Sequence, residues 1–334
     1  MTRYTFLLPA YKARYLREAI KSILDQTCRD FNLIVSDDCS PEDLKSIVDE
    51  FAGDPRLTYR RNVRNIGGGG NLTEHWNMLV NLCTTEWLIL ASDDDVYHPH
   101  FLEEIDRLTR KYPEVDLIHA RAQLIDCNGT VTRRDALYEE RVTQAEFMQQ
   151  LFYLNHTECI ANHALRTQAL RSMGGFVNLP LAWISDTATT WAMARNGAAN
   201  TRDTLFSFRL SGENISSHGA VFGKQLTGKT TATADTAVLR DKLQAGLMFD
   251  NFALQLFADI EPGDDTIQRD VCNYLRRTHG QHIYTLTYYL AEPLPFADYR
   301  QWVNHMRRRG YIRGVYPTYR LWKKWLWRKM HKHR

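Results

Sequence analysis

Short apolar runs alternate with segments of helical period through the first 120 residues of this chain. The runs that we predict as strands are Thr5–Leu8, Phe31–Ser36, Leu57–Arg61, Trp87–Ala91 and Asp116–Ala120. Between them, apolar residues recur at the spacing of helices with one buried face. This alternation predicts an α/β fold with a mainly parallel sheet flanked by helices. Ligands of such sheets bind beyond the carboxyl ends of the strands.

Polar residues follow three of these predicted strands. Pro9-Ala-Tyr11 follows the first, Asp37-Asp38 closes the second, and Asp93-Asp94-Asp95 comes directly after the apolar run Trp87–Ala91. Adjacent carboxylates repel one another, and a divalent cation offsets that repulsion most simply. A solvated acidic turn is the alternative, but the position after a buried strand favours a metal with an anionic ligand beyond it.

The organisation changes after residue 120. The pattern becomes mixed, and it is helical in character after about residue 230, with a long helix predicted from Val238 to Leu256. Residues 223–234 are rich in Gly, Thr and Ala, which indicates a boundary. We therefore predict a catalytic domain over residues 1–225 and a helical C-terminal region over residues 226–334.

Charge is distributed unevenly along the chain. From Arg300 to the end there are 12 Lys or Arg and no Asp or Glu, so residues 1–299 hold 30 basic against 39 acidic residues, a net charge of −9. Tryptophans interleave with these cations in residues 319–330, which can form an amphipathic helix. Such helices lie on anionic membrane surfaces. Packing of the tail on the acidic body is the main alternative, and no nucleic acid is expected.

The six cysteines are scattered without a C-x-x-C pair, which favours reduced thiols over a disulfide framework. No signal peptide is visible, and no apolar run approaches the roughly 20 residues that span a bilayer. We therefore expect a cytoplasmic protein, peripheral on the inner face of the membrane.

Several segments together resemble the family 2 glycosyltransferases of GT-A fold, a Rossmann-like fold of nucleotide-diphospho-sugar transferases. They are Thr5–Tyr11, Ala19–Thr27, Phe31–Ser40, Asn65–Gly67 and Glu86–Asp95. The resemblance implies a nucleotide-diphosphate sugar donor, a Mn²⁺ or Mg²⁺ ion, and inverting transfer to an acceptor hydroxyl. It further implies a glycan or lipid-linked acceptor in cell-surface polysaccharide synthesis.

The resemblance also implies nucleotide-binding residues. Asp38 occupies the family's position for accepting a hydrogen bond from the base, although a helix-capping acid is the alternative. Ser40 is predicted to cap the helix that follows. Pro9 and Tyr11 are expected to line the base and ribose, and Arg64 and Asn65 to touch the nucleotide. Uracil and thymine share the edge that Asp38 would bind, so the donor is expected to be UDP- or dTDP-linked.

The family's aspartate motif is present with one departure, because Ala91 stands where the first Asp is common. The resemblance places Asp93 near the nucleotide and Asp94 on the metal. Asp95 is either a second ligand or a helix-facing acid. A family histidine that often follows Arg209 by two residues is replaced by Ser211, and His218 is the predicted substitute on the metal or diphosphate.

Asp186 is the predicted general base. It follows the helix stop Met173-Gly-Gly175 at the position where the family supplies a carboxylate at the start of a helix. An ordinary N-terminal helix acid, favoured by the helix dipole, is the alternative. For His163, within the predicted strand Cys159–Leu165, a core position is favoured over one on the acceptor side.

Other classes of protein fit the sequence less well. A NAD dehydrogenase is disfavoured because Pro9-Ala-Tyr11 stands where G-x-G-x-x-G is required. A sugar-1-phosphate nucleotidyltransferase lacks its glycine-rich, lysine-bearing signature after the first strand. A non-catalytic, membrane-associated scaffold with a degenerate transferase fold stays open because of Ala91 and Ser211.

Overall fold

The structure is a computed structural model of the chain, and it describes residues 2–68, 72–153, 156–157, 159–211, 236–258, 269, 273, 296–308, 318–323 and 326. The chain divides into two compact units. The first unit comprises residues 1–178 and 185–213, and the second comprises residues 179–184 and 214–334. The predicted boundary at residue 225 falls outside the described residues and stays a prediction.

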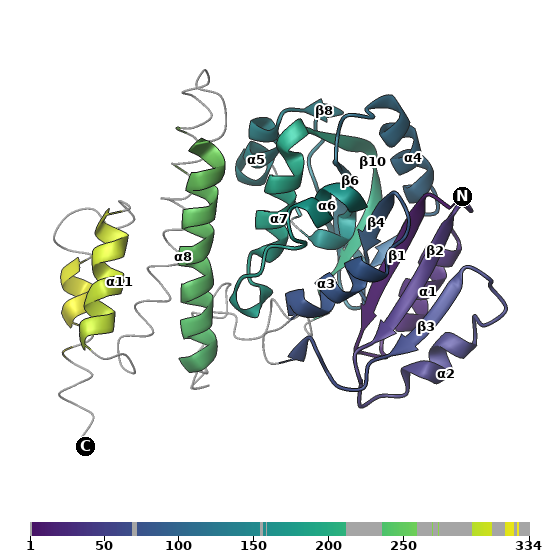
Figure 1. Cartoon of the computed structure of the whole chain (residues 1–334), viewed down its shortest axis with the longest axis horizontal. Helices are drawn as coiled ribbons and strands as arrows, with labels where there is room; N and C mark the ends of the chain where they lie inside the picture. The colour runs from purple at the N-terminus through teal and green to yellow at the C-terminus, as the bar shows by residue number, and fades with distance from the viewer. Residues whose placement is uncertain are drawn as a thin grey trace. The chain divides into compact units, whose positions relative to one another are not determined.

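The described strands of the first unit form one sheet of mixed direction (Figure 1). Their bounds are β1 Tyr4–Ala10, β2 Phe31–Asp37, β3 Leu57–Arg61, β4 Trp87–Leu90, β5 Val96–Tyr97, β6 Leu117–Ile125, β7 Val131–Arg134, β8 Arg141–Val142, β9 His163–Arg166 and β10 Ala198–Arg209. The main path runs in the order β3-β2-β1-β4-β9-β6-β10-β5, while β7 pairs with β6 and β8 with β10.

Strand β1 lies at the centre of a parallel block. It pairs with β2 from Tyr4 opposite Phe31 to Ala10 opposite Asp37, and with β4 on its other side. Strand β3 continues the block in parallel beyond β2. All four strands therefore end at the same edge of the sheet, which is where the sequence predicts the site. Strand β9 reverses direction between β4 and β6.

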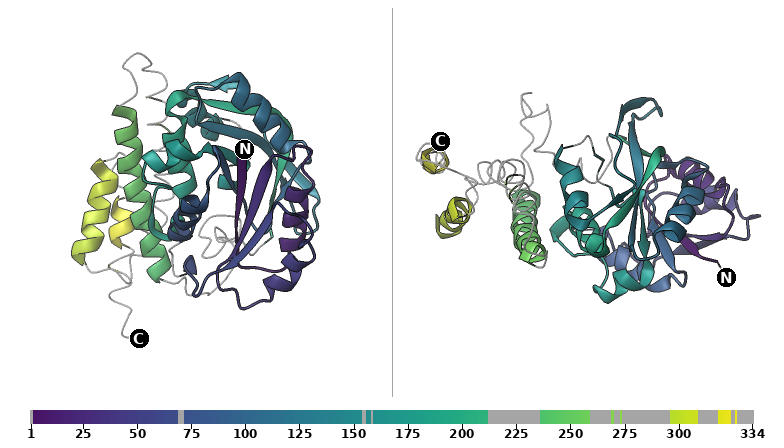
Figure 2. Two further views of the ribbon diagram at one scale, coloured as in Figure 1. Left: turned by 45° about the vertical axis from the view of Figure 1, so that its right-hand side comes forward. Right: turned by 90° about the horizontal axis from the view of Figure 1, so that it is seen from above.

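Helices lie on both faces of this sheet (Figure 2). Their bounds are α1 Leu16–Leu24, α2 Leu44–Asp49, α3 Leu72–Leu82, α4 Phe101–Lys111, α5 Gln144–Tyr153, α6 Thr167–Ser172 and α7 Ser185–Met193, with short 3₁₀ turns η2 Ile160–Asn162 and η4 Ala194–Asn196. Helix α1 shows why these segments are helical, because its buried residues recur on one face: Leu16, Ala19, Ile20, Ile23 and Leu24.

Aromatic rings fill the core between α1, α4 and the sheet. Phe6 of β1 meets Tyr97 edge-on at 5.3 Å between ring centroids, and Tyr97 meets Phe101 at 4.8 Å and Phe206 at 5.1 Å. Edge-to-face pairs of this kind contribute about 0.5–1.5 kcal/mol beyond the burial of their area. This packing fixes β5 and the start of α4, which flank the aspartate segment.

The structure corrects two local predictions. Ser40 does not cap α2; the cap is Asp43, which accepts from the Ser46 N–H at 3.2 Å. The Ser40 hydroxyl instead donates to the Tyr11 carbonyl oxygen at 2.6 Å, so the helix starts later. The predicted strand Cys159–Leu165 begins only at His163, because Ile160–Asn162 forms a 3₁₀ turn.

Other predictions are confirmed. Helix α6 ends at Ser172 and is followed by Gly174 and Gly175, both with positive φ. His163 is fully buried. The five described cysteines are free thiols.

The second unit contains the helices α8 Thr236–Ala258 and α11 Phe296–Arg308, a 3₁₀ turn η3 Pro180–Ala182, and a helical stretch over residues 318–323. Helix α8 confirms the predicted long helix. Of the amphipathic helix predicted over residues 319–330, residues 319–323 and 326 are helical, and the others lie outside the described residues. No helix within the described residues is long and apolar enough to cross a membrane.

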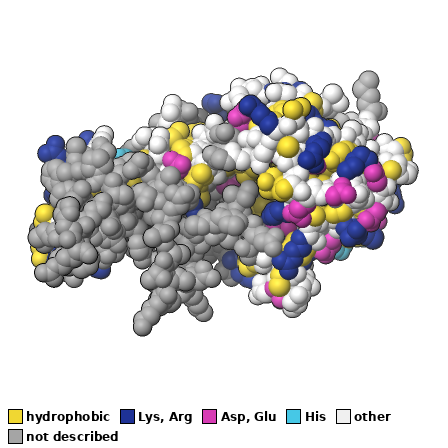
Figure 3. All heavy atoms as spheres, turned by 90° about the horizontal axis from the view of Figure 1, so that it is seen from below, with side chains coloured by type: hydrophobic (Ala, Val, Ile, Leu, Met, Phe, Trp, Pro, Cys, Tyr) yellow, Lys and Arg dark blue, Asp and Glu magenta, His cyan; other side chains and the backbone are white. Residues whose placement is uncertain are grey.

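Surface charge of both signs is mixed over the first unit. Figure 3 shows basic and acidic side chains next to one another on the face in view. Arg166, for example, pairs with Glu86 and Asp116 at 2.8 Å each, and Arg107 pairs with Glu104 and Glu140 at 2.7 Å each.

Candidate active site

The main chain just after β1 joins the turns that follow β2 and β4. The Ala10 carbonyl accepts from the Asp38 N–H at 2.9 Å, and the Tyr11 carbonyl accepts from Ser40. On the other side, the N–H groups of Tyr11 and Lys12 both donate to Asp93 Oδ2 at 2.9 Å. Residues 10–12 thus hold the two acidic turns at fixed positions relative to one another.

Asp93 is buried beneath this connection. Burial raises the pKa of its carboxyl group, while the Lys12 ammonium and the two N–H donors oppose the rise. The Lys12 Nζ lies 3.6 Å from Asp93 Oδ1 and 3.4 Å from Asp94 Oδ2. Lys12 therefore places one positive charge between two carboxylates.

Asp94 has a different set of neighbours. Its Oδ1 accepts from the Ser92 hydroxyl at 2.5 Å, and its Oδ2 accepts from the Ser211 hydroxyl at 3.3 Å. Lys12 also approaches Oδ2, so a cationic group and a hydroxyl converge on one carboxylate oxygen. The role of Asp94 as a metal ligand stays a prediction.

Asp95 faces the interior of the protein. Its Oδ1 accepts from the Arg209 N–H at 2.8 Å, and its Oδ2 is buried with no hydrogen-bond partner in the described part of the chain. Burial, and then the neighbouring charge of Asp94, raise the pKa of Asp95 well above its usual range. The contact of Asp95 is thus with strand β10, and its role as a metal ligand stays a prediction.

Arg209, at the end of β10, forms hydrogen bonds with the aspartate segment and with α1. Its Nε donates to the Asp94 carbonyl at 2.8 Å, and its Nη2 donates to Glu18 at 2.6 Å. The guanidinium carbon lies 4.4 Å from the centre of the Tyr15 ring, within the range of a cation–π contact. One buried arginine thereby connects β10, α1 and the segment after β4.

Asp38 organises the loop after β3. Its Oδ1 accepts from the Asn62 amide and the Ile66 N–H, both at 2.8 Å, and its Oδ2 accepts from the Gly67 N–H at 2.7 Å. His75 Nδ1 lies 3.6 Å from the same Oδ2, and burial lowers the pKa of His75, with Asp38 opposing that change. Three of the about four acceptor positions of this carboxylate are therefore used within the protein, and His75 faces the same Oδ2 atom.

The other predicted nucleotide residues border this region. Pro9 lies in β1 opposite Ser36 of β2 and is partly buried, and the Tyr11 side chain is 42% exposed. Arg64 and Asn65 are exposed, and the Asn65 side chain accepts from the Gly68 N–H at 2.6 Å. Their contacts with a nucleotide stay predictions.

Asp186 lies in the first turn of α7, and its Oδ1 accepts from the Thr187 N–H at 2.9 Å. Burial raises the pKa of the Cys159 thiol well above its usual range, and the negative charges of Asp95, Asp186 and Asp94 add to that rise. The role of Asp186 as the base stays a prediction.

The residues present fit a cation at Asp94, since its Oδ2 already attracts Lys12 and Ser211. Within the described residues, no group of three His, Cys, Asp or Glu side chains has the arrangement of a complete metal site. An ion there would therefore take its remaining ligands from elsewhere, such as a donor diphosphate or water. His218, the other predicted ligand, lies outside the described residues.

Sequence reasoning missed Lys12, Glu18 and Cys159. Lys12 had a usable signal, because it follows a parallel strand at the same edge as the aspartates. Glu18 and Cys159 had none, because their roles depend on contacts between residues far apart in the chain.

Residues 5–174, just over half of the chain, match Glycosyl transferase family 2. The chain belongs to this family, as its motifs indicated.

Two curated relatives show the extent of the similarity. Uncharacterized glycosyltransferase MJ1057 of Methanocaldococcus jannaschii is 24% identical over 162 residues, which cover 48% of this chain and 53% of the relative. Protein CgeD of Bacillus subtilis is 22% identical over 204 residues, or 58% of this chain and 46% of that protein. The chain thus spans about half the length of these relatives.

Solved structures share the fold. TarS 1–349 of S. aureus, in complex with UDP-GlcNAc, superposes with a TM-score of 0.60 at 17% identity, covering 90% of this chain and 79% of that chain. The mannosyltransferase PcManGT of Pyrobaculum calidifontis, in complex with GDP-Man and Mn²⁺, gives a TM-score of 0.54 at 16% identity, covering 98% and 88%. The predicted GT-A fold class is confirmed.

Proposed function

We propose that this chain is a metal-dependent inverting glycosyltransferase. It moves a sugar from a UDP- or dTDP-linked donor to a hydroxyl of a glycan or lipid-linked acceptor in cell-surface polysaccharide synthesis. The observation that carries the proposal is that the main chain after β1 joins Asp38 and Asp93 at the edge where β1, β2 and β4 end in parallel. The complexes of TarS with UDP-GlcNAc and of PcManGT with GDP-Man support a nucleotide-sugar donor.

In this proposal, the donor lies along the edge where β1, β2 and β4 end. Asp38 accepts a hydrogen bond from the base, and Pro9 and Tyr11 flank the base and ribose. Arg64 and Asn65 contact the nucleotide from the loop after β3. Asp93 faces the nucleotide, and Lys12 offsets negative charge beside the diphosphate.

The transfer step uses Asp186 as the base. Its carboxylate takes the proton from the acceptor hydroxyl while the hydroxyl oxygen forms a bond to the anomeric carbon of the donor sugar. The bond from that carbon to the diphosphate oxygen breaks on the opposite side, and the nucleoside diphosphate leaves. Attack opposite the leaving group inverts the anomeric configuration.

Asp94 is the proposed ligand for Mn²⁺ or Mg²⁺, with Asp95 and His218 as further predicted ligands. A bound divalent ion would offset the charge that develops on the leaving diphosphate. The complex of PcManGT with GDP-Man and Mn²⁺ supports a divalent metal.

Calorimetric titration with UDP and dTDP, each with and without Mn²⁺, tests the donor site. We expect nucleotide binding that depends on the metal and is lost in Asp94→Ala, with Asp203→Ala, an exposed residue of β10, as the control. A panel of sugar nucleotides then identifies the donor by metal-dependent hydrolysis. Absence of metal-dependent binding for every nucleoside diphosphate would favour the non-catalytic scaffold.

We also propose that the tail over residues 319–330 binds an anionic membrane surface. The support is its run of Lys, Arg and Trp without any acid. Co-sedimentation with anionic liposomes compares the intact chain with one that ends near Gly310. Equal binding by both chains would contradict a role for the tail.

A further inference from the structure

Helix α11 in the second unit has one face that is fixed by packing. Tyr299, Val303 and Met306 are each at most 1% exposed, and they recur at helical spacing. The Tyr299 hydroxyl donates to the Leu321 carbonyl at 3.0 Å, and its ring meets Trp322 edge-on at 5.5 Å. This face attaches α11 to the helical stretch over residues 318–323.

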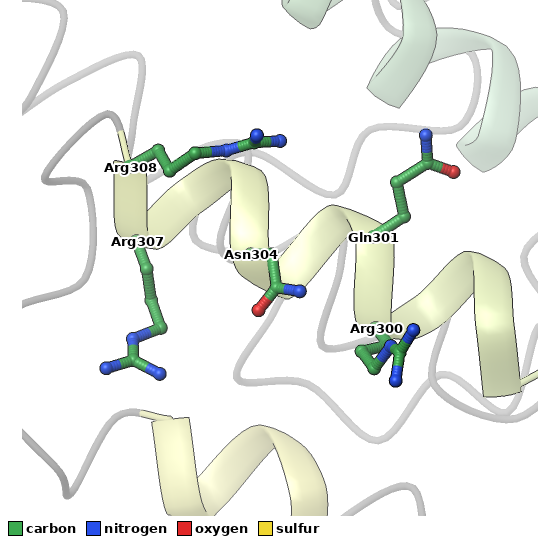
Figure 4. Close-up of a pocket in the computed structure, with 5 residues that line it drawn as sticks. All are labelled: Arg300, Gln301, Asn304, Arg307 and Arg308. Carbon is green, nitrogen blue, oxygen red and sulfur yellow. The ribbon is translucent and has the colours of Figure 1, made fainter.

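The exposed face of α11 borders an open cavity of about 690 Å³. The described side chains that line it are Arg300, Gln301, Asn304, Arg307 and Arg308. Figure 4 looks onto this face, with Arg300 and Arg307 along one edge of the helix and Gln301 and Arg308 along the other. Three cations and two amides therefore surround one space, and none of the five side chains is an acid.

These arginines are not balanced by the described part of the chain. Among described residues, no carboxylate pairs with Arg300, Arg307 or Arg308, and Asp250 of α8 instead lies 3.5 Å from His305 of α11. The sequence holds no Asp or Glu from Arg300 to its end. A guanidinium stays protonated at any physiological pH. Within the described residues, the cavity thus concentrates positive charge without a counter-charge, and an anionic ligand would offset the repulsion.

We propose that this cavity binds a phosphate-bearing group, in a site separate from the donor site. The planar fork of arginine donates two parallel hydrogen bonds to phosphate oxygens, and several arginines suit a multivalent anion. Gln301 and Asn304 can both donate and accept, which suits hydroxyl groups next to a phosphate. The described lining holds no aromatic ring on which a base could stack, so single-stranded nucleic acid fits less well.

The phosphate can belong to a soluble molecule or to a lipid headgroup, and two probes separate these sources. The full chain is titrated calorimetrically with inorganic pyrophosphate in EDTA, so that metal-dependent binding does not contribute. In parallel, it is sedimented with phosphatidylglycerol vesicles and with phosphatidylcholine vesicles. The site variant is Arg300→Gln/Arg307→Gln/Arg308→Gln. The control, Arg17→Gln/Arg110→Gln/Arg134→Gln, removes the same charge from exposed residues of the first unit.

We expect the site variant to weaken binding of at least one probe by about tenfold or more, since charge-assisted hydrogen bonds are lost. The control should change it less than about twofold, the scale of screened surface charge. If the site variant binds pyrophosphate more weakly, the phosphate belongs to a soluble molecule. If it binds only the phosphatidylglycerol vesicles more weakly, the phosphate belongs to a lipid headgroup. Wild-type affinity of the site variant for both probes, or an equal loss in the control, would overturn the proposal.

Should the glutamine variant fail to fold, the corresponding triple lysine variant is measured instead. It keeps all three charges but lacks the planar fork, so it should bind several-fold more weakly than wild type. Unchanged affinity of the lysine variant would count against the site, because charge alone would then suffice.

Discussion

Charged residues are used differently in the first unit and on α11. In the first unit, Arg209 is 1% exposed and contacts the Asp94 carbonyl, the Glu18 carboxylate and the Tyr15 ring. On α11, Arg300 and Arg307 are exposed and meet no carboxylate among the described residues. Removing Arg209 leaves buried groups without their partner, whereas removing Arg307 leaves no described carboxylate without one. The first charge therefore contributes to folding, and the second is available for a ligand.

The largest expected effect is on catalysis and concerns Asp186, a charged residue of the first unit. We predict that Asp186→Asn lowers turnover by about 10²–10⁴-fold, the usual contribution of a general base. Nucleotide binding and the unfolding midpoint should stay close to wild type. Initial rates with the identified donor, compared with those of Asp203→Asn, measure this effect. Near-normal turnover of Asp186→Asn would remove the assignment.

The next effect is on folding. Arg209→Ala should lower the free energy of unfolding by about 3 kcal/mol, the low end for breaking a buried ion pair, because Glu18 is half-exposed. Urea unfolding measures the change. In contrast, Arg110→Ala on α4 breaks an exposed pair with Asp106 and should change stability by less than about 1 kcal/mol. A similar decrease in the free energy of unfolding for both variants would contradict the expected difference between buried and exposed ion pairs.

A third effect depends on pH and arises from buried histidines. Burial, and then the nearby His156 and His163, lower the pKa of His119 well below its ordinary value. The unfolded chain therefore takes up this proton first, at about pH 6.5. Stability is fully present above that pH and falls as the pH decreases through it, by up to about 1.4 kcal/mol per pH unit for one proton.

Urea midpoints measured at several pH values from neutral to mildly acidic test this. His119→Gln should make the acid-side slope shallower, while His100→Gln, which changes an exposed histidine of the first unit, should leave it as in wild type. An unaltered slope in His119→Gln would show that other groups carry the pH dependence.

The smallest effect concerns the exposed arginines of α11. Arg307→Gln should leave the free energy of unfolding within about 0.5 kcal/mol of wild type, as for other surface substitutions. Any change should be towards greater stability, because repulsion among the three arginines decreases. Thermal unfolding at low salt is the sensitive measurement. A loss above about 1 kcal/mol would reveal that Arg307 has a structural partner.

The sequence predicted the parallel block and its polar edge because strand ends and helix spacing are local patterns. The family resemblance assigned Asp93 to the nucleotide and Asp94 to the metal, and it left the role of Asp95 open. In the structure, each of the three aspartates has different hydrogen-bond partners. The Ser40 cap was predicted wrongly because its hydroxyl bonds to Tyr11, a residue distant in sequence. The Glu18–Arg209 pair and the Cys159 thiol could not be predicted, because each depends on strands or helices that meet only after folding.

The basic C-terminal run was visible in the sequence, but the sequence did not show that three of its arginines share one face of a separate helix, α11. Helical spacing alone gives two faces for α11, but only the packing of Tyr299 on Leu321 shows which face is exposed. Sequence reasoning assigned the basic residues to one tail, whereas α11 collects three of them around one cavity.

The connection after β1 has a consequence for how this enzyme class diversifies. Tyr11 contacts Ser40 and Asp93 through its own main-chain atoms, whereas Lys12 also reaches Asp93 and Asp94 with its side chain. A substitution at Tyr11 therefore keeps the hydrogen bonds that position these residues while it changes a side chain that is 42% exposed. A library confined to Tyr11 is a direct way to search for new donor preferences.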